Sequence, residues 1–296
     1  MDEKNLNALI SLLDDDDREV YAHVRERLLD LGIQVIPRLE QVWAGAENPG
    51  MHRKLEDIIR EIQFSALQKE FTEWAHSLDA DLLTGAWLVS RLIFPGIDLD
   101  DIRRKMLRLR QHIWLELSVN QSPLEQIHTF NQIFYYHEGF RGNQSEEPFD
   151  FCLSHVLEKR TGNSLSLGIL YQCLASDLNL PVYGVNLPRH FVLCFCRRTL
   201  LDFPQTDDSA KDILFYINPI NKGSVFSRNE IKEYLQRLNL HSNPRYFLPS
   251  PPKKIIQELI HQMREAFRDK KDAQRVHELS LLLQILDNES QTQAEE

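Results

Sequence analysis

Three polar residues in the second half of the sequence have the types and the order of a nucleophilic site: Ser164, His190 and Asn218. Ser164 stands at the predicted start of an apolar helix, His190 starts a predicted strand, and Asn218 follows a later strand. A helix N-terminus has free N–H groups and a positive potential, which favour a nucleophile or an oxyanion. A neighbouring imidazole could act as base, and a carboxamide could fix its tautomer.

Each of these residues also has a purely structural explanation. Ser164 could be only a helix cap, because serine there accepts backbone N–H groups. His190 could be a structural residue at a strand start, and Asn218 precedes a proline, as turn residues often do. Upstream, Asn131 or Gln132 could donate to an oxyanion, or could simply pack on a helix. The residue types alone leave both explanations open.

The segments around these positions carry a family resemblance. They are Arg160-Thr161-Gly162-Asn163-Ser164-Leu165-Ser166-Leu167, then Leu180 to Phe191, and upstream Phe130-Asn131-Gln132 with Gly139-Phe140-Arg141-Gly142-Asn143. This combination resembles the SirB-type branch of the transglutaminase-like superfamily, which is papain-like, over about residues 50–240. The resemblance implies a papain-like α+β core, often flanked by helical repeats.

The sequence departs from the catalytic pattern of that family at two of three positions. The resemblance implies a Cys nucleophile and an Asp, but Ser164 and Asn218 stand there, and only His190 matches. Serine has no thiolate fraction near neutral pH, and an amide cannot stabilise an imidazolium by charge. We therefore expect a non-catalytic protein that binds a peptide or protein partner in a degenerate groove. The alternative is a weak acyl hydrolase, peptidase or acyltransferase that uses all three residues.

The elements before residue 121 are predicted to be helices from apolar residues at helical spacing. The expected segments are Leu6–Leu13, Val20–Leu31, Ile33–Val42, Leu55–Phe64, Leu82–Phe94 and Asp98–Leu117. The order of these elements resembles one HEAT-type repeat: a helix, the acidic turn from Asp14 to Asp17, a second helix and then Gly32. The acidic run itself is typical of a helix N-terminus, where carboxylates favour the dipole. The basic residues from Arg103 to Arg110 are expected on a solvated helix face.

The pattern changes near residue 140, where strands begin to alternate with helices. Helices are expected at Cys152–Arg160, Ser164–Leu178, Ser227–Leu238, Ile255–Phe267 and Ala273–Leu286, with a frayed polar tail from Asp287. Strands are expected at Val182–Leu187, His190–Cys196, Leu200–Phe203 and Ile213–Ile217. The fold class is therefore α+β: a helical N-terminal region (1–121), a transglutaminase-like core (122–240) and a C-terminal α-hairpin (241–296).

Composition excludes several functions. The net charge is −10, from 34 Lys and Arg against 44 Asp and Glu, which argues against nucleic acid as a partner. No apolar run is long enough to span a membrane. The opening residues lack a signal pattern, so we expect a cytoplasmic protein. Neither metal nor cofactor is expected, since no H-E-x-x-H motif appears and Cys194 and Cys196 should pack as apolar residues. The oligomeric state stays open.

Overall fold

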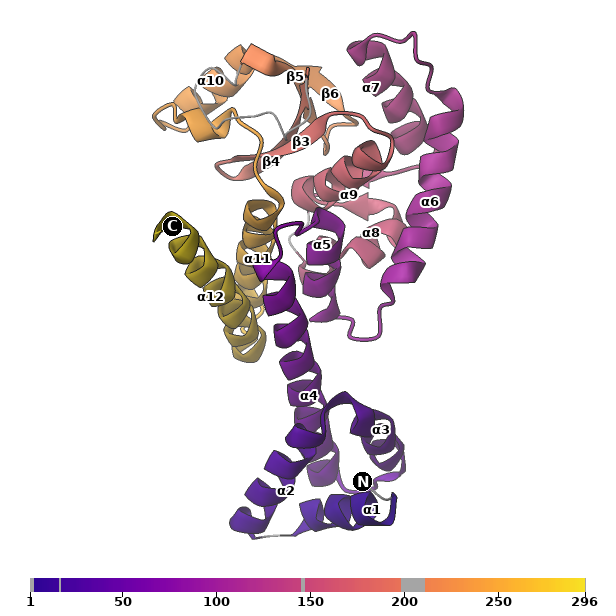
Figure 1. Ribbon diagram of the computed structural model, residues 1–296, viewed down its shortest axis with the longest axis vertical. Helices are drawn as coiled ribbons and strands as arrows, with labels where there is room; N and C mark the ends of the chain where they lie inside the picture. Colours follow the sequence, from indigo (N-terminus) through magenta and orange to yellow (C-terminus); the bar gives the residue numbers. More distant parts are fainter. Residues whose placement is uncertain (1–2, 16, 145–146, 198–210, 296) are drawn as a thin grey trace. The chain divides into compact units, whose positions relative to one another are not determined.

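The computed structural model describes residues 3–15, 17–144, 147–197 and 211–295 and divides the chain into two compact units, 1–73 and 74–296. The described part of the first unit is helical (Figure 1). Its elements are α1 (Glu3–Ser11), η1 (Leu12–Asp14), α2 (Arg18–Leu31), η2 (Gly32–Val35), α3 (Ile36–Gly45) and the part of α4 (Pro49–His76) up to residue 73.

The local signals for these helices are the ones that the sequence predicts. Asp17 caps α2 by accepting the backbone N–H of Glu19 at 2.8 Å, so the acidic run begins a helix. Gly32 ends α2 at a φ of 69°, a conformation that glycine adopts without a Cβ clash. Pro37 lies in the first turn of α3. The helices enclose their own core of buried residues: Ile10, Leu13, Val24, Leu28, Val35, Leu39, Met51, Leu55, Ile58 and Ile62.

The second unit combines helices with two sheets. Its helices are α5 (Leu82–Arg91), α6 (Leu99–Glu116), α7 (Pro123–Asn131), η3 (Gln132–His137), η4 (Pro148–Phe151), α8 (Leu153–Lys159), α9 (Ser164–Asp177), α10 (Arg228–Arg237), η7 (Pro244–Tyr246), α11 (Pro252–Asp269) and α12 (Ala273–Glu295). The larger sheet is antiparallel in the order β3 (Val182–Leu187), β4 (His190–Cys196), β5 (Ile213–Asn218) and β6 (Ser224–Phe226). The predicted strand Leu200–Phe203 lies outside the described residues.

Helices cover both faces of the larger sheet (Figure 1). On one face α9 packs against β3 and β4, with the Phe191 ring next to Gly168. On the other face Val192 and the strand cysteines pack against Ile231 and Leu235 of α10. All residues of α9 from Leu165 to Ala175 are buried, which confirms that this apolar helix is central. The α+β class with C-terminal helices is confirmed.

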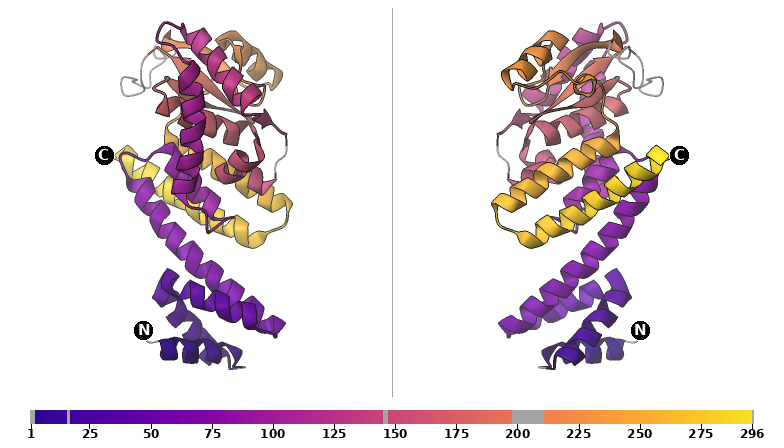
Figure 2. Two further views of the ribbon diagram at one scale, coloured as in Figure 1. Left: turned by 90° about the vertical axis from the view of Figure 1, so that its right-hand side faces the viewer. Right: turned by 90° about the vertical axis from the view of Figure 1, so that its left-hand side faces the viewer.

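The C-terminal helices α11 and α12 pack side by side as an antiparallel hairpin (Figure 2). The expected fraying from Asp287 is wrong for the backbone, because α12 continues to Glu295. Two cross-links from α11 hold the start of this segment. Lys253 Nζ donates to Glu289 at 2.5 Å, and Gln257 Nε2 donates to Asp287 at 2.6 Å.

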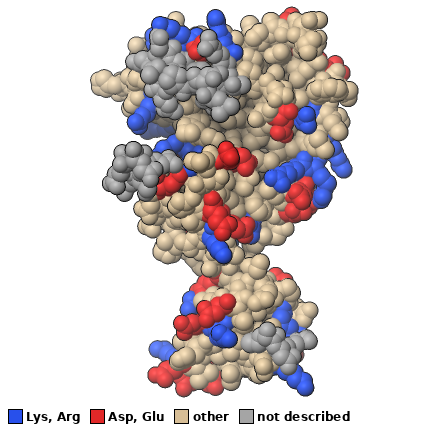
Figure 3. Space-filling view, in the orientation of Figure 1, with Lys and Arg blue, Asp and Glu red and all other residues tan. Residues whose placement is uncertain are grey.

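The surface of α6 is a solvated helix face. Its basic residues are exposed, and Arg103 and Arg104 pair with Asp100 and Asp101 one turn earlier. Figure 3 shows Lys and Arg beside Asp and Glu over this helix. In the ranges that the structure describes, no helix is both long and apolar enough to cross a membrane.

Candidate functional site

The N-terminus of α9 is held by Asn163. Its Oδ1 accepts the backbone N–H groups of Leu165 at 3.1 Å and Ser166 at 2.9 Å. Asn163, and not Ser164, is therefore the helix cap, because its side chain reaches over the first turn from an extended backbone. Ser164 is the first helical residue, and among the described residues neither its N–H nor its hydroxyl has a hydrogen-bond partner. Ser166 faces the core and is fully buried.

A short parallel ladder brings the upstream glycine motif to this helix end. Strand β1 (Arg141–Gly142) pairs with β2 (Thr161–Gly162), and the Asn143 N–H donates to the Gly162 carbonyl at 2.9 Å. Asn143 and Asn163 thus lie at the ends of neighbouring strands. Gly142 lies directly against the turn after β5, since a Cβ there would lie 2.5 Å from the Ile220 carbonyl oxygen.

His190 lies on the opposite face of the sheet from α9. It pairs across the ladder with Leu187, which belongs to the cluster packed against α10. Its ring is exposed and lies 5.8 Å from the ring of Tyr234, measured between centroids. The Tyr234 hydroxyl donates to the Pro188 carbonyl at 2.7 Å, so α10 holds the β3–β4 turn. Arg189 completes that turn at a φ of 62°.

Asn218 is engaged in its own turn. Its Oδ1 accepts the N–H groups of Ile220 at 3.2 Å and Asn221 at 3.3 Å, and its carbonyl accepts from Gly223. This is the turn role that the following proline suggested. The tight turn leads β5 into β6.

The structure brings two of the three predicted residues to one cavity. Ser164 and His190 both line a cavity of about 640 Å³, together with Asn143, Asn163 and Arg189. No hydrogen bond joins Ser164 to His190 within the described residues. Asn218 is not among the described residues that line this cavity. The three side chains therefore share a region without forming a connected hydrogen-bonded triad.

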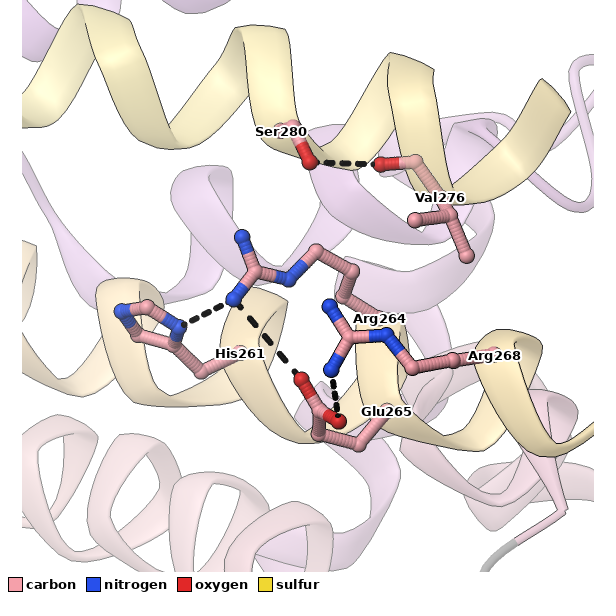
Figure 4. A network of polar contacts seen from close by, with 6 residues as sticks. All are labelled: His261, Arg264, Glu265, Arg268, Val276 and Ser280. Atoms are coloured by element: carbon pink, nitrogen blue, oxygen red, sulfur yellow. Dashed lines mark hydrogen bonds and ion pairs between the residues drawn. The ribbon is translucent and has the colours of Figure 1, made fainter. Parts of the chain in front are cut away.

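Helix α11 supplies the acidic wall of the cavity, with Glu258, Gln262 and Glu265. Figure 4 shows that Glu265 is already paired, with Arg264 at 3.7 Å and with Arg268. Glu258 accepts a hydrogen bond from Gln262 at 2.7 Å and has no ion pair within the described chain. Its carboxylate is therefore the uncompensated negative charge of this wall.

Asn131 and Gln132 do not lie in this cavity. The Asn131 Nδ2 donates to the Gly223 carbonyl at 2.9 Å, and its Oδ1 accepts from the Tyr171 hydroxyl at 3.0 Å. Burial raises the pKa of Tyr171 well above its usual value, so its hydroxyl stays a donor. Asn131 and Gln132 instead line a separate cavity of about 870 Å³ beside α7 and the β5–β6 turn. The amide of Asn131 thus braces the turn that follows Asn218.

The cysteines are buried and take no part in the cavity. Cys194 and Cys196 share one face of β4, with their Sγ atoms 3.8 Å apart, and burial raises the pKa of Cys194. Among the residues that the structure describes, no group of three or more His, Cys, Asp or Glu side chains is arranged to hold a metal ion.

More than half of the chain matches a known protein family. Residues 100–261, from α6 to α11, match the transglutaminase-like superfamily, and this range contains the whole cavity except Glu265 and Gln262. The chain belongs to the transglutaminase-like superfamily. The SirB-type branch is a finer assignment than this match. No solved structure matches the chain.

Several curated proteins are similar to part of the chain. A UPF0162 protein of Vibrio cholerae is 26% identical over 158 residues, 52% of this chain and 53% of that protein. F-box only protein 21 of Mus musculus is 27% identical over 150 residues, 49% of this chain and 22% of that protein. A UPF0162 protein of Haemophilus influenzae is 33% identical over 94 residues, 31% of this chain and 35% of that protein. The chain thus spans about half the length of the Vibrio relative and about a fifth of the F-box protein.

Residue types alone missed several members of the site. Asn143 and Asn163 belong to the glycine motifs of the family resemblance, so their neighbourhood carried a signal. Arg189 lies between a proline and the predicted histidine, and only the tight turn makes it part of the cavity. Glu258 follows from no local pattern, because α11 is far from the motifs in sequence and is brought there by packing on α5 and β3.

Proposed function

We propose that this transglutaminase-like domain is a non-catalytic module that binds an extended peptide segment of a protein partner in the cavity between α9, the β3–β4 turn and α11. One observation carries the proposal: Ser164 and His190 line the same cavity without a hydrogen bond between them. A serine nucleophile depends on a base that accepts its proton through such a bond. The structure therefore has the cavity but not the hydrogen-bonded nucleophile and base that catalysis requires.

Two further features support binding over catalysis. The Oδ1 of Asn218, which would have to orient the imidazole, accepts two backbone N–H groups of its own turn. The cavity volume of about 640 Å³ lies within the range of about 300–1,000 Å³ that is usual for ligand pockets. Amides, a hydroxyl and charged groups at its wall suit the N–H and C=O groups of a peptide.

Acyl transfer by Ser164 is the second candidate. In its favour, the Ser164 hydroxyl lies at a helix N-terminus in the same cavity as His190, and a free enzyme can tighten such bonds only in its substrate complex. The substrate would be a peptide, an isopeptide-like amide or an ester. No metal or cofactor is part of either candidate.

Labelling with a fluorophosphonate serine probe separates the two candidates. We expect no labelling of the native protein, and equally none of Ser164→Ala or His190→Ala. Ser154→Ala, at another first helical turn (α8), serves as the matched control. Labelling of the native protein that disappears in both site variants, and persists in the control, would overturn the non-catalytic proposal.

Peptide binding is tested with a pool of fluorescein-labelled randomised hexapeptides and the full chain, by fluorescence polarisation. Ser164→Leu places a larger apolar side chain at the cavity wall, and we expect it to abolish binding. Ser154→Leu makes the same change at another half-buried serine and should bind like the unmodified chain. Equal binding by both variants would place the peptide outside this cavity.

The remaining assignments are proposals of the same kind. We propose that the chain is of the SirB-type branch, that its N-terminal helices form a HEAT-like partner surface, and that it binds a protein partner, not nucleic acid, in the cytoplasm. The three-part division at residues 121 and 240 is likewise a prediction. A fragment of residues 1–121 that folds on its own would support the first of these boundaries.

A further inference from the structure

We infer that the occupant of this cavity is the free C-terminal end of a polypeptide with a Lys or Arg near that end. The terminal carboxylate lies at the N-terminus of α9 beside Arg189, and the basic side chain reaches Glu258. The inference rests on the proposed binding function and names the class of peptide that the cavity takes.

The end of the cavity at α9 is built for an anion. The N–H and hydroxyl of Ser164, which have no partner among the described residues, lie at the positive end of a 14-residue helix. Asn163 lines the cavity and is only 9% exposed, yet its Nδ2 has no partner among the described residues. A buried amide donor without an acceptor requires an explanation. A carboxylate oxygen would accept from these donors.

Arg189 adds a full positive charge to the lining of the same cavity. It lies in the β3–β4 turn, which the Tyr234–Pro188 hydrogen bond fixes, and it forms no ion pair with the described carboxylates. Arginine binds a carboxylate through two parallel N–H donors, a geometry that a neutral amide cannot match. A terminal carboxylate is therefore favoured over the internal carbonyl groups of a peptide.

The wall on α11 has the opposite character. Glu265 is compensated by Arg264 and Arg268 (Figure 4), whereas Glu258 has only the Gln262 amide as a partner among the described residues. An anion alone would be stabilised by the donors at the α9 end but repelled by the Glu258 carboxylate on α11. A ligand with a carboxylate and a nearby cation matches both ends at once.

The test uses two pools of fluorescein-labelled randomised hexapeptides, identical except that one ends in a free carboxylate and the other in an amide. Binding to the full chain is measured by fluorescence polarisation at low ionic strength. We expect the amide pool to bind about ten- to a hundredfold more weakly, the usual effect of losing hydrogen bonds to a charged group. Sub-pools with a fixed Lys near the end should bind better than those with Gln.

Two substitutions test which end of the cavity binds the carboxylate and which binds the basic side chain. Arg189→Gln should weaken the free-acid pool and leave the amide pool unchanged, and Glu258→Gln should remove the preference for Lys. Arg237→Gln and Glu233→Gln, exposed on α10 and outside the cavity lining, are the matched controls.

Each result decides between the two proposals. Equal binding of both pools, lost on Ser164→Leu, overturns the carboxylate inference and leaves peptide binding intact. Failure of both pools overturns the binding function as well. Amidated sub-pools ending in Asp that bind as tightly as the free acids would assign the anion end to side-chain carboxylates and overturn the C-terminal assignment.

Discussion

Replacing Asn163 with alanine should destabilise the second unit more than the loss of an ordinary helix cap. The amide oxygen of Asn163 is the acceptor for two backbone donors, at Leu165 and Ser166, and both of these residues are fully buried. Water cannot replace the lost acceptor at such positions. The same substitution also removes a wall of the cavity, so peptide binding should fall with stability.

The magnitude follows from that burial. Removing an N-cap acceptor costs about 0.5–2 kcal/mol, typically about 1. Leaving a buried donor without a partner costs about 1–3 kcal/mol. Since two buried donors share the Asn163 oxygen, we expect a loss of about 2–3 kcal/mol. Asp98 provides the comparison, because it caps α6 in the same unit, is exposed, and accepts only the N–H of Asp100. Its alanine variant should lose about 0.5–1 kcal/mol.

The assay is urea unfolding followed by circular dichroism, with both alanine variants and Asn163→Ser, which keeps a capping oxygen. The expected order of stability is native, then Asn163→Ser, then Asn163→Ala, with Asp98→Ala close to native. If Asn163→Ala lost no more free energy of unfolding than Asp98→Ala, the cap would not hold the start of α9. The account of the cavity wall would then be wrong.

Three further predictions concern packing, thiols and pH. Gly142→Ala should cost about 1–3 kcal/mol of unfolding free energy, because its Cβ would meet the Ile220 backbone, which cannot rotate away. Burial raises the pKa of Cys152 to about 12, so iodoacetamide at mildly alkaline pH should modify it far more slowly in the native than in the urea-unfolded chain. The capping box with Ser122 lowers the pKa of Glu125 below its usual 4.5. Glu125→Gln should therefore destabilise the protein at neutral pH, with a difference that shrinks as pH falls below 4.5 and disappears once pH lies below the lowered pKa of Glu125.

For each of these three predictions, one experimental outcome would refute it. Gly96→Ala, where an added Cβ meets nothing within 4 Å, should be nearly neutral, and an equal loss at both glycines would refute the steric argument. Rapid modification of Cys152 in the native chain, mapped by mass spectrometry, would contradict its burial. A Glu125→Gln difference that grew on acidification would have the wrong sign for a depressed carboxyl pKa.

The sequence by itself determined most of the longer elements and some of their ends, although the short strands β1, β2 and β6 and the full length of α4 were not predicted. The strands β3 and β4 begin and end at the predicted residues, and β5 differs by the addition of Asn218. Ser122 starts α7 with a capping box, and Gly32 ends α2 as the sequence predicts. These features depend on interactions between residues that are close in the sequence. They are capping hydrogen bonds, the left-handed backbone conformation of glycine and the spacing of apolar residues, and a short stretch of sequence is enough to predict them.

Only the tertiary structure decided which chemical groups meet. The pleat of β4 turns His190 to the α10 face, so a base that looked adjacent to Ser164 in chain order makes no hydrogen bond with it. The side-chain oxygen of Asn218 accepts hydrogen bonds within its own turn, because the tight turn into β6 brings two backbone N–H groups close to it. Glu258 reaches the cavity only through the packing of α11. Such contacts join residues far apart in the chain, and no local pattern encodes which face of a strand or which side of a distant helix they occupy.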